Sequence, residues 1–495
     1  MNLFQNPLLL VTFFPLAGFL IVLLIDGEQK KAIRWVTLIT SLVTFGLSLW
    51  MLSQFNTANP DAQMVIDAPW LTIGNISVRF LMGVDGLSIL MVLLTTLLTP
   101  IAILSTWESV KEGVKGFMLF FLMLETGMLG VFLALDLVLF FVFWEFTLVP
   151  MYFLIGIWGG ERRVYAAIKF FLFTMVGSML MLAGIVYVGM QGGTFALSDL
   201  IAKRAVFAGA QTLLFLAFGL AFAIKVPMFP LHTWLPDAHV EAPTAGSVIL
   251  AGVLLKMGAY GFLRFNLPLF PQAMLQLAPW MGILAVIGIL YGAAVAFAQK
   301  DAKKLVAYSS VSHLGFVMLG IFALTLQSLS GAILQMVNHG LSTGALFLIV
   351  GFIYERCHTR ELAAFGGLWK VMPMLGGLAL VVTLSSMALP GLNGFVGEFN
   401  ILVGSFNSTM PYAHWIAGAA ALGVILAAVY LLHFFERIFL GPVTREENKT
   451  LKDLSAREII ILVPLLILIF WIGLYPQPFF NLIDPTVAKL VSLVP

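Results

Sequence analysis

Apolar runs of about 20 residues recur along the whole chain, and they limit the possible fold more than any other feature of the sequence. A run of that length, coiled as an α-helix, matches the hydrocarbon thickness of a lipid bilayer. Of the 495 residues, 61% are hydrophobic and only 10% are charged. This composition is typical of a polytopic membrane protein and argues against a soluble globular fold.

Fourteen transmembrane helices fit the apolar pattern, and no linker is long enough to separate a soluble domain. We therefore predict an all-α polytopic membrane protein with a single transmembrane domain over residues 1–495. Between these helices, the loop over residues 53–80 is a candidate for a short pair of strands. The predicted spans are 7–25, 33–52, 84–106, 115–133, 136–157, 165–190, 211–235, 244–264, 274–298, 302–324, 328–354, 371–405, 412–438 and 457–476.

Most of the 26 lysines and arginines fall in loops on one side of this predicted layout. Cytoplasmic loops of membrane proteins carry an excess of Lys and Arg. The bias therefore supports the layout and predicts that both chain termini face away from the cytoplasm. The first apolar run lacks a basic start and a small-residue cleavage site, so we predict a retained span and not a signal peptide.

Several common kinds of functional site are excluded by the sequence. Cys357 is the only cysteine, which rules out a disulfide framework and a cysteine-held iron–sulfur cluster. No G-x-G-x-x-G motif follows a strand, and the sequence has neither a Walker motif nor H-E-x-x-H. The net charge of +2, without a basic cluster, gives no indication of nucleic-acid binding.

An internal repeat is indicated by matching landmarks about five spans apart. Since five is odd, the two copies must cross the membrane in opposite directions, which makes the repeat inverted. Paired broken helices in an inverted repeat point to a transport site near the bilayer mid-plane. The matching landmarks are Asp136 and Asp301, Ala167-Ile168 and Ala332-Ile333, and the helix-breaking Pro227 and Pro390.

Lys225 is an unusual residue for its position, because it ends an apolar run and precedes Pro227 and Pro230. A lysine at the centre of a spanning helix costs roughly 2.5–3.5 kcal/mol. The prolines remove backbone donors and clash with the preceding turn. A charge beside such a break is tolerated where it faces protein or water. We predict a place on an ion or proton path, the alternative being that Lys225 only satisfies freed carbonyls.

Glu145 is the predicted partner of Lys225. Its neighbours are bulky and apolar, so burial disfavours the ionised carboxylate while a nearby cation favours it. A carboxylate balanced between these effects can load and release a proton. The alternative is a purely structural partner for a lysine.

Lys256 is a second lysine in the middle of a span, too far from either end for its amine to reach water easily. Gly252 and Gly258 allow neighbouring helices to approach closely. We predict a second site of a proton relay. The alternative is an ion pair with Glu145 or with Glu125, which is a further carboxylate in the membrane.

His313 and His339 lie in consecutive spans among serines and an asparagine. Imidazole titrates near neutral pH and can pass a proton between its two nitrogens, although buried histidines are often only structural. No carboxylate or cysteine has the spacing of a metal site. Glu398 follows the second helix break and is either an exit gate for protons or a cap for the restarting helix.

The loop over residues 231–244 carries His232, Asp237 and His239 but no Lys or Arg. It is therefore a candidate proton entrance on the cytoplasmic side. The alternative is a tight loop in which Thr244 caps the next helix.

Four stretches resemble the antiporter-like M-type subunits of respiratory complex I, NADH:quinone oxidoreductase. They are Phe143-Trp144-Glu145 and residues 148–155, 232–239 and 242–247, and the resemblance extends from about residue 80 to about residue 475. It implies fourteen helices, with inverted repeats in helices 4–8 and 9–13 and breaks in helices 7 and 12. The chain would then divide into residues 1–110, 115–264, 274–438 and 457–476.

The resemblance also implies roles for particular residues. In that family a glutamate of helix 5 pairs with a lysine of helix 7, a lysine of helix 8 and later histidines form a central axis, and a charge in helix 12 gates the exit. The L- and N-type relatives usually have lysine at the helix 12 position, and L-type chains continue into a long lateral helix. Both differences favour the M type. The matching positions here are Glu145, Lys225, Lys256, His313, His339 and Glu398.

The resemblance implies a proton-translocating subunit with no redox centre of its own. NADH, FMN, iron–sulfur clusters and quinone would belong to partner subunits, and the neighbours would be L- and N-type subunits and lipids in a bacterial plasma membrane. A thylakoid-type membrane is a weaker alternative. Other possible functions are a subunit of a cation/proton antiporter or a membrane hydrogenase, and a structural spacer. Lysines and histidines, in place of oxygen-rich coordination, favour protons over sodium.

Overall fold

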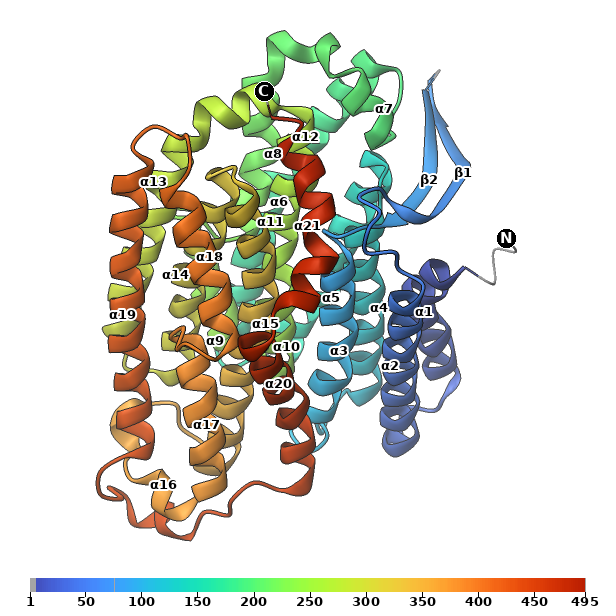
Figure 1. Cartoon of the computed structure of the whole chain (residues 1–495). Helices are drawn as coiled ribbons and strands as arrows, with labels where there is room; N and C mark the ends of the chain where they lie inside the picture. The colour runs from blue at the N-terminus through green and yellow to red at the C-terminus, as the bar shows by residue number, and fades with distance from the viewer. Residues whose placement is uncertain (1–5, 75, 495) are drawn as a thin grey trace.

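The computed structural model describes residues 6–74 and 76–494, which form a bundle of long helices with one β-hairpin at one end (Figure 1). The predicted all-α class is confirmed, and so is the predicted strand pair. The first part of the chain comprises α1 (Pro7–Leu24), α2 (Lys30–Ser53), the antiparallel strands β1 (Gln63–Ile73) and β2 (Ile76–Val84), α3 (Ile89–Ser105), α4 (Val114–Leu133), α5 (Leu137–Trp158) and α6 (Arg163–Gly192).

The middle of the chain is divided into shorter helical segments. It comprises α7 (Leu197–Ala202), the 3₁₀ segment η2 (Arg204–Ala210), α8 (Gln211–Lys225), α9 (Trp234–Glu241), α10 (Thr244–Ile249), the π-helical η3 (Leu250–Leu254), α11 (Leu255–Gly261), the π-helical η4 (Phe262–Asn266) and α12 (Leu267–Leu269).

The last part of the chain contains the longest helices. It comprises α13 (Pro271–Phe297), α14 (Ala302–Phe322), α15 (Leu326–Cys357), η5 (Leu362–Ala364), α16 (Leu368–Val371), α17 (Pro373–Ser386), α18 (Asn393–Phe406), α19 (Ala413–Phe439), η6 (Glu446–Thr450), α20 (Ala456–Leu474) and α21 (Gln477–Val491). The sequence did not predict α21.

Within the described residues, twelve helices are long and apolar enough to cross a membrane. They include the combined stretches Arg204–Lys225 and Thr244–Leu269, and two shorter apolar helices, α3 and α17, accompany them. The count of fourteen therefore stays a prediction. An 18-residue apolar stretch of α15 and one within Thr244–Leu269 are wholly buried, so the centre of the bundle is where the polar residues need partners.

Both predicted helix breaks are confirmed. α8 ends at Lys225 and the chain becomes helical again only at Trp234. The Trp234 indole N–H donates to the Ile224 carbonyl over 2.9 Å, which satisfies one backbone group that the break frees. The second break lies between α17 and α18, where the Asn338 side chain donates to the Asn393 carbonyl over 2.7 Å.

Asp136 and Asp301 have the same local structure, 165 residues apart. Each is an N-cap whose carboxylate accepts backbone N–H bonds, for α5 and α14 respectively. Each also forms an isolated antiparallel bridge to the residue 60 positions later, Ala196 and Glu361. The first bridge lies near α7 and the hairpin, and the second leads toward α16 at the opposite end of the molecule (Figure 1).

Close helix contacts at the predicted glycines are confirmed. A Cβ on Gly258 would lie 2.5 Å from the Phe222 carbonyl oxygen, so α11 touches the end of α8. A Cβ on Gly340 would lie 2.9 Å from the Gly252 carbonyl oxygen, so η3 touches α15. The centre of the bundle is thus held by backbone-to-backbone packing of the kind that small residues permit.

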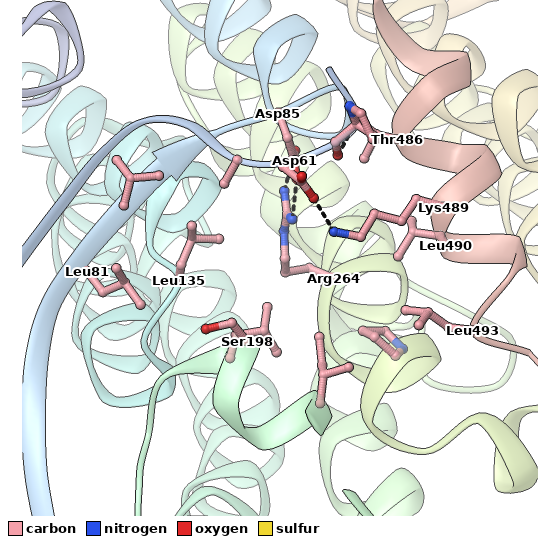
Figure 2. A pocket seen from close by; sticks show the side chains of 16 residues that line it. Asp61, Leu81, Asp85, Leu135, Ser198, Arg264, Thr486, Lys489, Leu490 and Leu493 are labelled. Atoms are coloured by element: carbon pink, nitrogen blue, oxygen red, sulfur yellow. Dashed lines mark hydrogen bonds and ion pairs between the residues drawn. The ribbon is translucent and has the colours of Figure 1, made fainter. Parts of the chain in front are cut away.

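A cavity of about 420 Å³ lies between the hairpin, α7 and α21 (Figure 2). Its walls are mostly apolar, but Arg264 of η4 pairs with Asp85 through two hydrogen bonds of 2.5 and 2.6 Å. Lys489 of α21 pairs with Asp61 in the loop before β1. α21 therefore ties the end of the chain to the hairpin.

Candidate functional site

Lys256, His339, His313 and Glu398 form one buried line through the middle of the bundle. Lys256 Nζ lies 2.6 Å from His339 Nδ1, and the rings of His339 and His313 are 6.0 Å apart between centroids. His313 Nδ1 lies 2.9 Å from Glu398 Oε1. All four residues are at most 3% exposed. Residues from α11, α14, α15 and α18 thus meet, as the sequence predicted for Lys256, His313, His339 and Glu398.

Lys256 is held by an irregular stretch of helix. Its ammonium also donates to the carbonyl of Ala251, which lies in the π-helical η3 just before it. Single π-helical turns are rare and occur frequently at functional sites. No ion pair joins Lys256 to Glu125 or Glu145 in the described chain, so the alternative of such a pair is wrong.

Glu398 ends the line without capping its helix. α18 begins at Asn393, and the Glu398 side chain contacts His313 and the Gln335 amide, which donates to Glu398 Oε1 over 3.0 Å. The Tyr430 hydroxyl of α19 lies 3.0 Å from the other nitrogen of His313. The cap alternative for Glu398 is therefore wrong, and His313 is in contact with polar groups on both sides of its ring.

A small polar cavity borders the two histidines. It is lined by His313, His339, Asn338, Ser342 and Ser385, among others. Its volume of about 10 Å³ is near the least space that holds one water molecule. Because the centroids of the two histidine rings are 6.0 Å apart, a proton needs an intermediate carrier between them. The hydroxyl and amide groups that line this cavity can hold such a carrier by hydrogen bonds.

Lys225 lies apart from this line. Its side chain is 1% exposed, and its ammonium lies 5.3 Å from the Trp144 ring and 5.6 Å from the Phe170 ring. Cation–π contacts of this kind partly replace water around a buried ammonium. Among the described residues no hydrogen bond or ion pair of the Lys225 ammonium occurs, and the freed Ile224 carbonyl accepts from Trp234 instead, so the structure does not support the alternative role of Lys225 as a donor to freed carbonyls.

Glu145 and Lys225 are electrostatic neighbours but not a contact pair. Lys225 and Ser178 of α6 are the polar groups beside the Glu145 carboxyl, and no Glu145–Lys225 ion pair within 4 Å occurs in the described chain. Glu145 Oε1 has no hydrogen-bond partner there. Glu145 and Lys225 therefore lie near each other but do not form the predicted direct pair. Beside them, the Trp144 indole N–H donates to the Ser178 hydroxyl over 3.0 Å.

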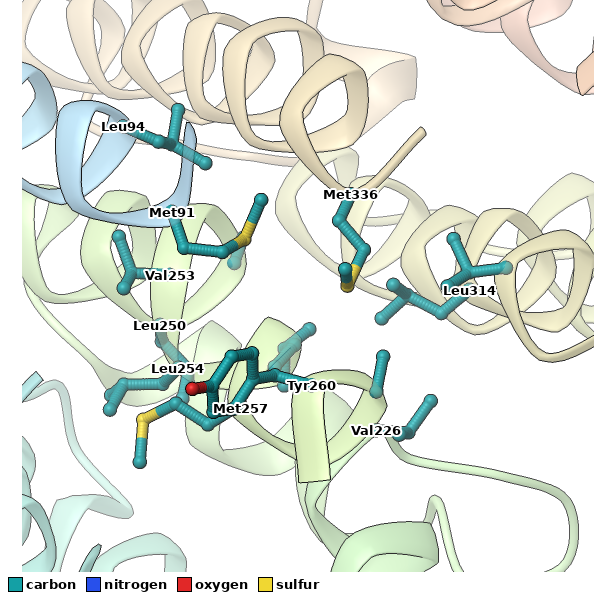
Figure 3. Packing of buried hydrophobic residues seen from close by; sticks show 14 of the residues in the cluster. Met91, Leu94, Val226, Leu250, Val253, Leu254, Met257, Tyr260, Leu314 and Met336 are labelled. Atoms are coloured by element: carbon teal, nitrogen blue, oxygen red, sulfur yellow. The ribbon is translucent and has the colours of Figure 1, made fainter. Parts of the chain in front are cut away.

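Apolar side chains pack beside both lysines. Val226, Met257 and Leu314 belong to one buried cluster (Figure 3), and the first two directly follow Lys225 and Lys256 in the chain. No hydrogen bond of the described residues joins Lys225 or Glu145 to Lys256. The predicted relay residues thus fall into two groups, one around Lys225 and one from Lys256 to Glu398.

The predicted entrance residues have three different environments. His232 packs against the rings of Tyr291 and Phe229 and is 3% exposed. Asp237 pairs with Lys169 over 2.6 Å and remains partly exposed. His239 is fully buried, stacks 4.5 Å from Phe347, and has no partner on either ring nitrogen among the described residues.

Donors from elsewhere in the chain, two of them lysine ammonium groups, contact this loop, which has no Lys or Arg of its own. Besides the Lys169 pair, the Lys303 ammonium of α14 donates to the Ala242 carbonyl over 2.5 Å. The Arg162 backbone N–H donates to the Glu241 carboxylate over 2.9 Å. Thr244 is the first residue of α10 and makes no side-chain cap, so the capping alternative is wrong, and the entrance role stays a prediction.

Several contacts of the site were not predicted from the sequence. Tyr430, Gln335, Ser178 and Asn393 are ordinary polar residues within apolar spans, and only the fold shows which of them face the titratable groups. A possible signal was their occurrence in helices that are otherwise almost wholly apolar, since a buried polar group requires a hydrogen-bonding partner.

Comparison with known proteins places this arrangement in a family. Residues 134–424 match the family described as NADH:quinone oxidoreductase/Mrp antiporter, TM. The chain is 48% identical to NADH-quinone oxidoreductase subunit M of Rhodobacter capsulatus, over 99% of this chain and 97% of that one. It is 44% identical to NADH-ubiquinone oxidoreductase chain 4 of Marchantia polymorpha, over 97% and 95% of the two chains.

Solved structures show the same fold. A chain of respiratory complex I from Thermus thermophilus with bound NADH superposes with a TM-score of 0.89 at 34% identity, covering 99% of this chain and all of that one. A chain of the membrane-bound sulfane sulfur reductase, an archaeal respiratory membrane complex, gives 0.84 at 26% identity over 94% and 76% of the two chains. The chain belongs to the NADH:quinone oxidoreductase/Mrp antiporter family of membrane proteins.

Proposed function

We propose that this chain is a proton-translocating membrane-arm subunit of NADH:quinone oxidoreductase, respiratory complex I. The observation that carries the proposal is the buried line from Lys256 through His339 and His313 to Glu398. Buried ionisable side chains in a membrane protein are expensive, and where they line up they mark ion and proton paths. The relatives named as subunit M and the fold shared with complex I support this choice.

Each group on the line can hold a proton and pass it on, with an intermediate carrier between the two histidine rings. Lys256 alternates between ammonium and amine, and His339 and His313 each exchange a proton between two ring nitrogens. Glu398 holds the proton last, next to His313. Moving one charge against 100 mV costs about 2.3 kcal/mol. A change of that size in the electrostatic interaction between Glu145 and Lys225 would therefore suffice to set the direction of proton transfer.

The electron chemistry is proposed to lie in partner subunits. NADH, FMN, iron–sulfur clusters and quinone would be held there, and L- and N-type antiporter-like subunits would flank this chain in a bacterial plasma membrane. The basic loops would face the cytoplasm and both termini the other side. The bacterial relatives and the membrane-spanning fold support this location.

Two inverted five-helix repeats are proposed as the framework of the site. The matching caps and bridges of Asp136 and Asp301, near opposite ends of the molecule, support this proposal. On that division the N-terminal helices cover residues 1–110, the repeats 115–264 and 274–438, and the last span 457–476. Lys225 belongs to the first repeat and Glu398 to the second.

Replacing Glu145 with glutamine is expected to lower NADH-driven proton pumping roughly tenfold. Glutamine keeps the size of the side chain and its hydrogen bonding but cannot carry the charge that acts on Lys225. The measurement is proton uptake by proteoliposomes that contain the whole complex, with its subunit composition checked on a native gel.

Glu447→Gln is the matched control, because Glu447 is an exposed residue of the 3₁₀ segment η6 and is not part of the buried line. It should pump like the unmodified complex. Normal pumping by the Glu145→Gln complex would instead favour a structural spacer, in which the buried charges only hold helices together.

A further inference from the structure

Tyr430 is a buried tyrosine of α19 that touches the buried line without being one of its four members. α19 packs beside α13 at one edge of the bundle (Figure 1), and Tyr430 is fully buried there. Its hydroxyl oxygen lies 3.0 Å from His313 Nε2, and Ser309, one turn before His313 in α14, is the other polar residue beside that hydroxyl. A buried hydroxyl is costly without a hydrogen bond, so the contact with His313 stabilises a tyrosine at this position.

Close packing between α19 and α14 fixes the position of Tyr430. Gly423 lies two turns before Tyr430 on the same face of α19. A Cβ on Gly423 would lie 3.0 Å from the ring of Phe316, which follows His313 by three residues in α14. The two helices therefore cannot move apart or together easily beside this contact, and their backbones set the distance between the hydroxyl and the imidazole.

The His313 ring is held at both of its nitrogens, by side chains from two different helices. Nδ1 lies 2.9 Å from Glu398 Oε1 of α18, and Nε2 lies 3.0 Å from the Tyr430 hydroxyl of α19. The χ2 torsion of a histidine is roughly two-fold, so a half-turn of the ring would put a carbon in place of each nitrogen. Such a half-turn would break both hydrogen bonds at once. Tyr430 therefore adds to the cost of turning the ring away from Glu398.

A hydroxyl group is suited to hold a nitrogen that gains and loses a proton, because it has one hydrogen to donate and lone pairs with which to accept. When His313 Nε2 is bare, the Tyr430 O–H donates to it, and when Nε2 carries a proton, the same oxygen accepts from it. In the second case the Ser309 oxygen has lone pairs for the Tyr430 proton, since the Ser309 hydroxyl donates its own proton to the Val306 carbonyl over 2.7 Å. The contact therefore persists in both protonation states of Nε2.

We propose that Tyr430 is a positioning residue of the buried line, which keeps the His313 ring turned so that Nδ1 faces Glu398 throughout the proton-transfer cycle. The step that it serves is the transfer from the His313 imidazolium to the Glu398 carboxylate. In this step the Nδ1–H bond breaks, an O–H bond forms on the carboxylate, and the two opposite charges cancel. Tyr430 itself gives up no proton. The inference rests on the proposed function and deepens it.

Tyr430→Phe is the test, in the whole complex reconstituted into liposomes. The substitution removes one oxygen atom and keeps the ring that packs inside the bundle, so the complex should assemble normally. We expect the number of protons pumped per NADH oxidised to fall roughly fivefold, the effect of one lost hydrogen bond on the orientation of the imidazole. Tyr412→Phe is the matched control, because Tyr412 directly precedes α19 and is 73% exposed. The control should pump like the unmodified complex.

An infrared difference spectrum between the oxidised and the reduced complex separates positioning from packing. The Tyr430 hydroxyl changes between donor and acceptor as His313 Nε2 gains and loses its proton, so the spectrum should contain a C–O band of one tyrosine, identified by labelling with ring-deuterated tyrosine. The band should be absent from the Tyr430→Phe complex and present in the Tyr412→Phe complex. A tyrosine that only fills space would give no such band.

Three results would overturn the inference: pumping at the control ratio by the Tyr430→Phe complex, a tyrosine band that survives this substitution, or an unmodified complex without a tyrosine band. The proposed function is tested separately by Glu145→Gln. If Glu145→Gln pumps normally, the proposed function itself fails. If Glu145→Gln loses pumping and Tyr430→Phe does not, the failure is confined to the role of Tyr430.

Discussion

Replacing Lys256 with methionine is expected to reduce NADH-driven proton pumping about 100-fold, the size of effect seen when a positioned proton-transfer group is lost. Lys256 is the only residue of the line that contacts His339, over 2.6 Å, among the described hydrogen bonds. Methionine fills the same space with an apolar chain, so the close contacts at Gly252 and Gly258 persist and the complex should assemble.

The matched control for that variant is Lys489→Met. Lys489 is an exposed lysine of α21 that pairs with Asp61 and lies outside the line. Pumping by the control should equal that of the unmodified complex. A Lys256→Met complex that pumps at more than half of the control rate, roughly, would show that His339 receives its proton by another route.

Breaking the Asp85–Arg264 pair is expected to have the largest effect on stability. Both side chains are buried and face each other (Figure 2), and the guanidinium also donates to the Tyr260 hydroxyl over 2.8 Å. Asp85→Asn would leave the Arg264 charge buried without its counter-ion, which costs about 3–5 kcal/mol. The measurement is the unfolding temperature of the purified complex together with the yield of assembled complex.

A double variant separates the loss of a charge partner from the loss of packing. Asp85→Leu with Arg264→Leu removes both charges at once, and replacing a buried pair by apolar side chains is often nearly neutral. The double variant should therefore be more stable than Asp85→Asn alone. Equal destabilisation of the two would mean that the geometry of the hydrogen bonds, and not the buried charge, sets the stability.

The same pair gives a pH dependence with a definite sign. Burial alone would raise the pKa of Asp85, but the Arg264 guanidinium and the backbone N–H groups of Leu87 and Ser88 outweigh burial and hold that pKa below its ordinary value. The stabilisation is therefore fully present above the pKa of an unfolded aspartate and is lost as the pH falls through the lowered pKa of the folded protein. Near neutral pH it should not vary.

The architecture was predictable from the sequence because its signals are strong. Apolar runs of membrane length, and prolines inside two of them, constrain the backbone directly. The breaks after Lys225 and before Asn393 follow from that chemistry. α21 was missed because its single apolar face, interrupted by Pro485, is weaker than a spanning pattern. Its partners, Asp61 and Ser330, are remote in sequence.

The site was predictable in its members but not in its contacts. Six titratable residues within apolar spans are conspicuous, yet their pairing depends on helix rotation, which spacing alone does not determine. Lys256 turns to His339 because a π-helical segment precedes it, and no sequence signal for that segment was recognised. Glu145 and Lys225 are neighbours whose direct contact was expected, but the Trp144 ring lies beside the ammonium.

The number of protons pumped per NADH oxidised is the most direct test of the buried line as a proton path. It should be compared between complexes that carry Lys256→Met and Lys489→Met, at matched rates of NADH oxidation. If protons pass from Lys256 to Glu398, the ratio falls in the first complex and is unchanged in the second. An unchanged ratio in the Lys256→Met complex would contradict that path, whatever its effect on turnover.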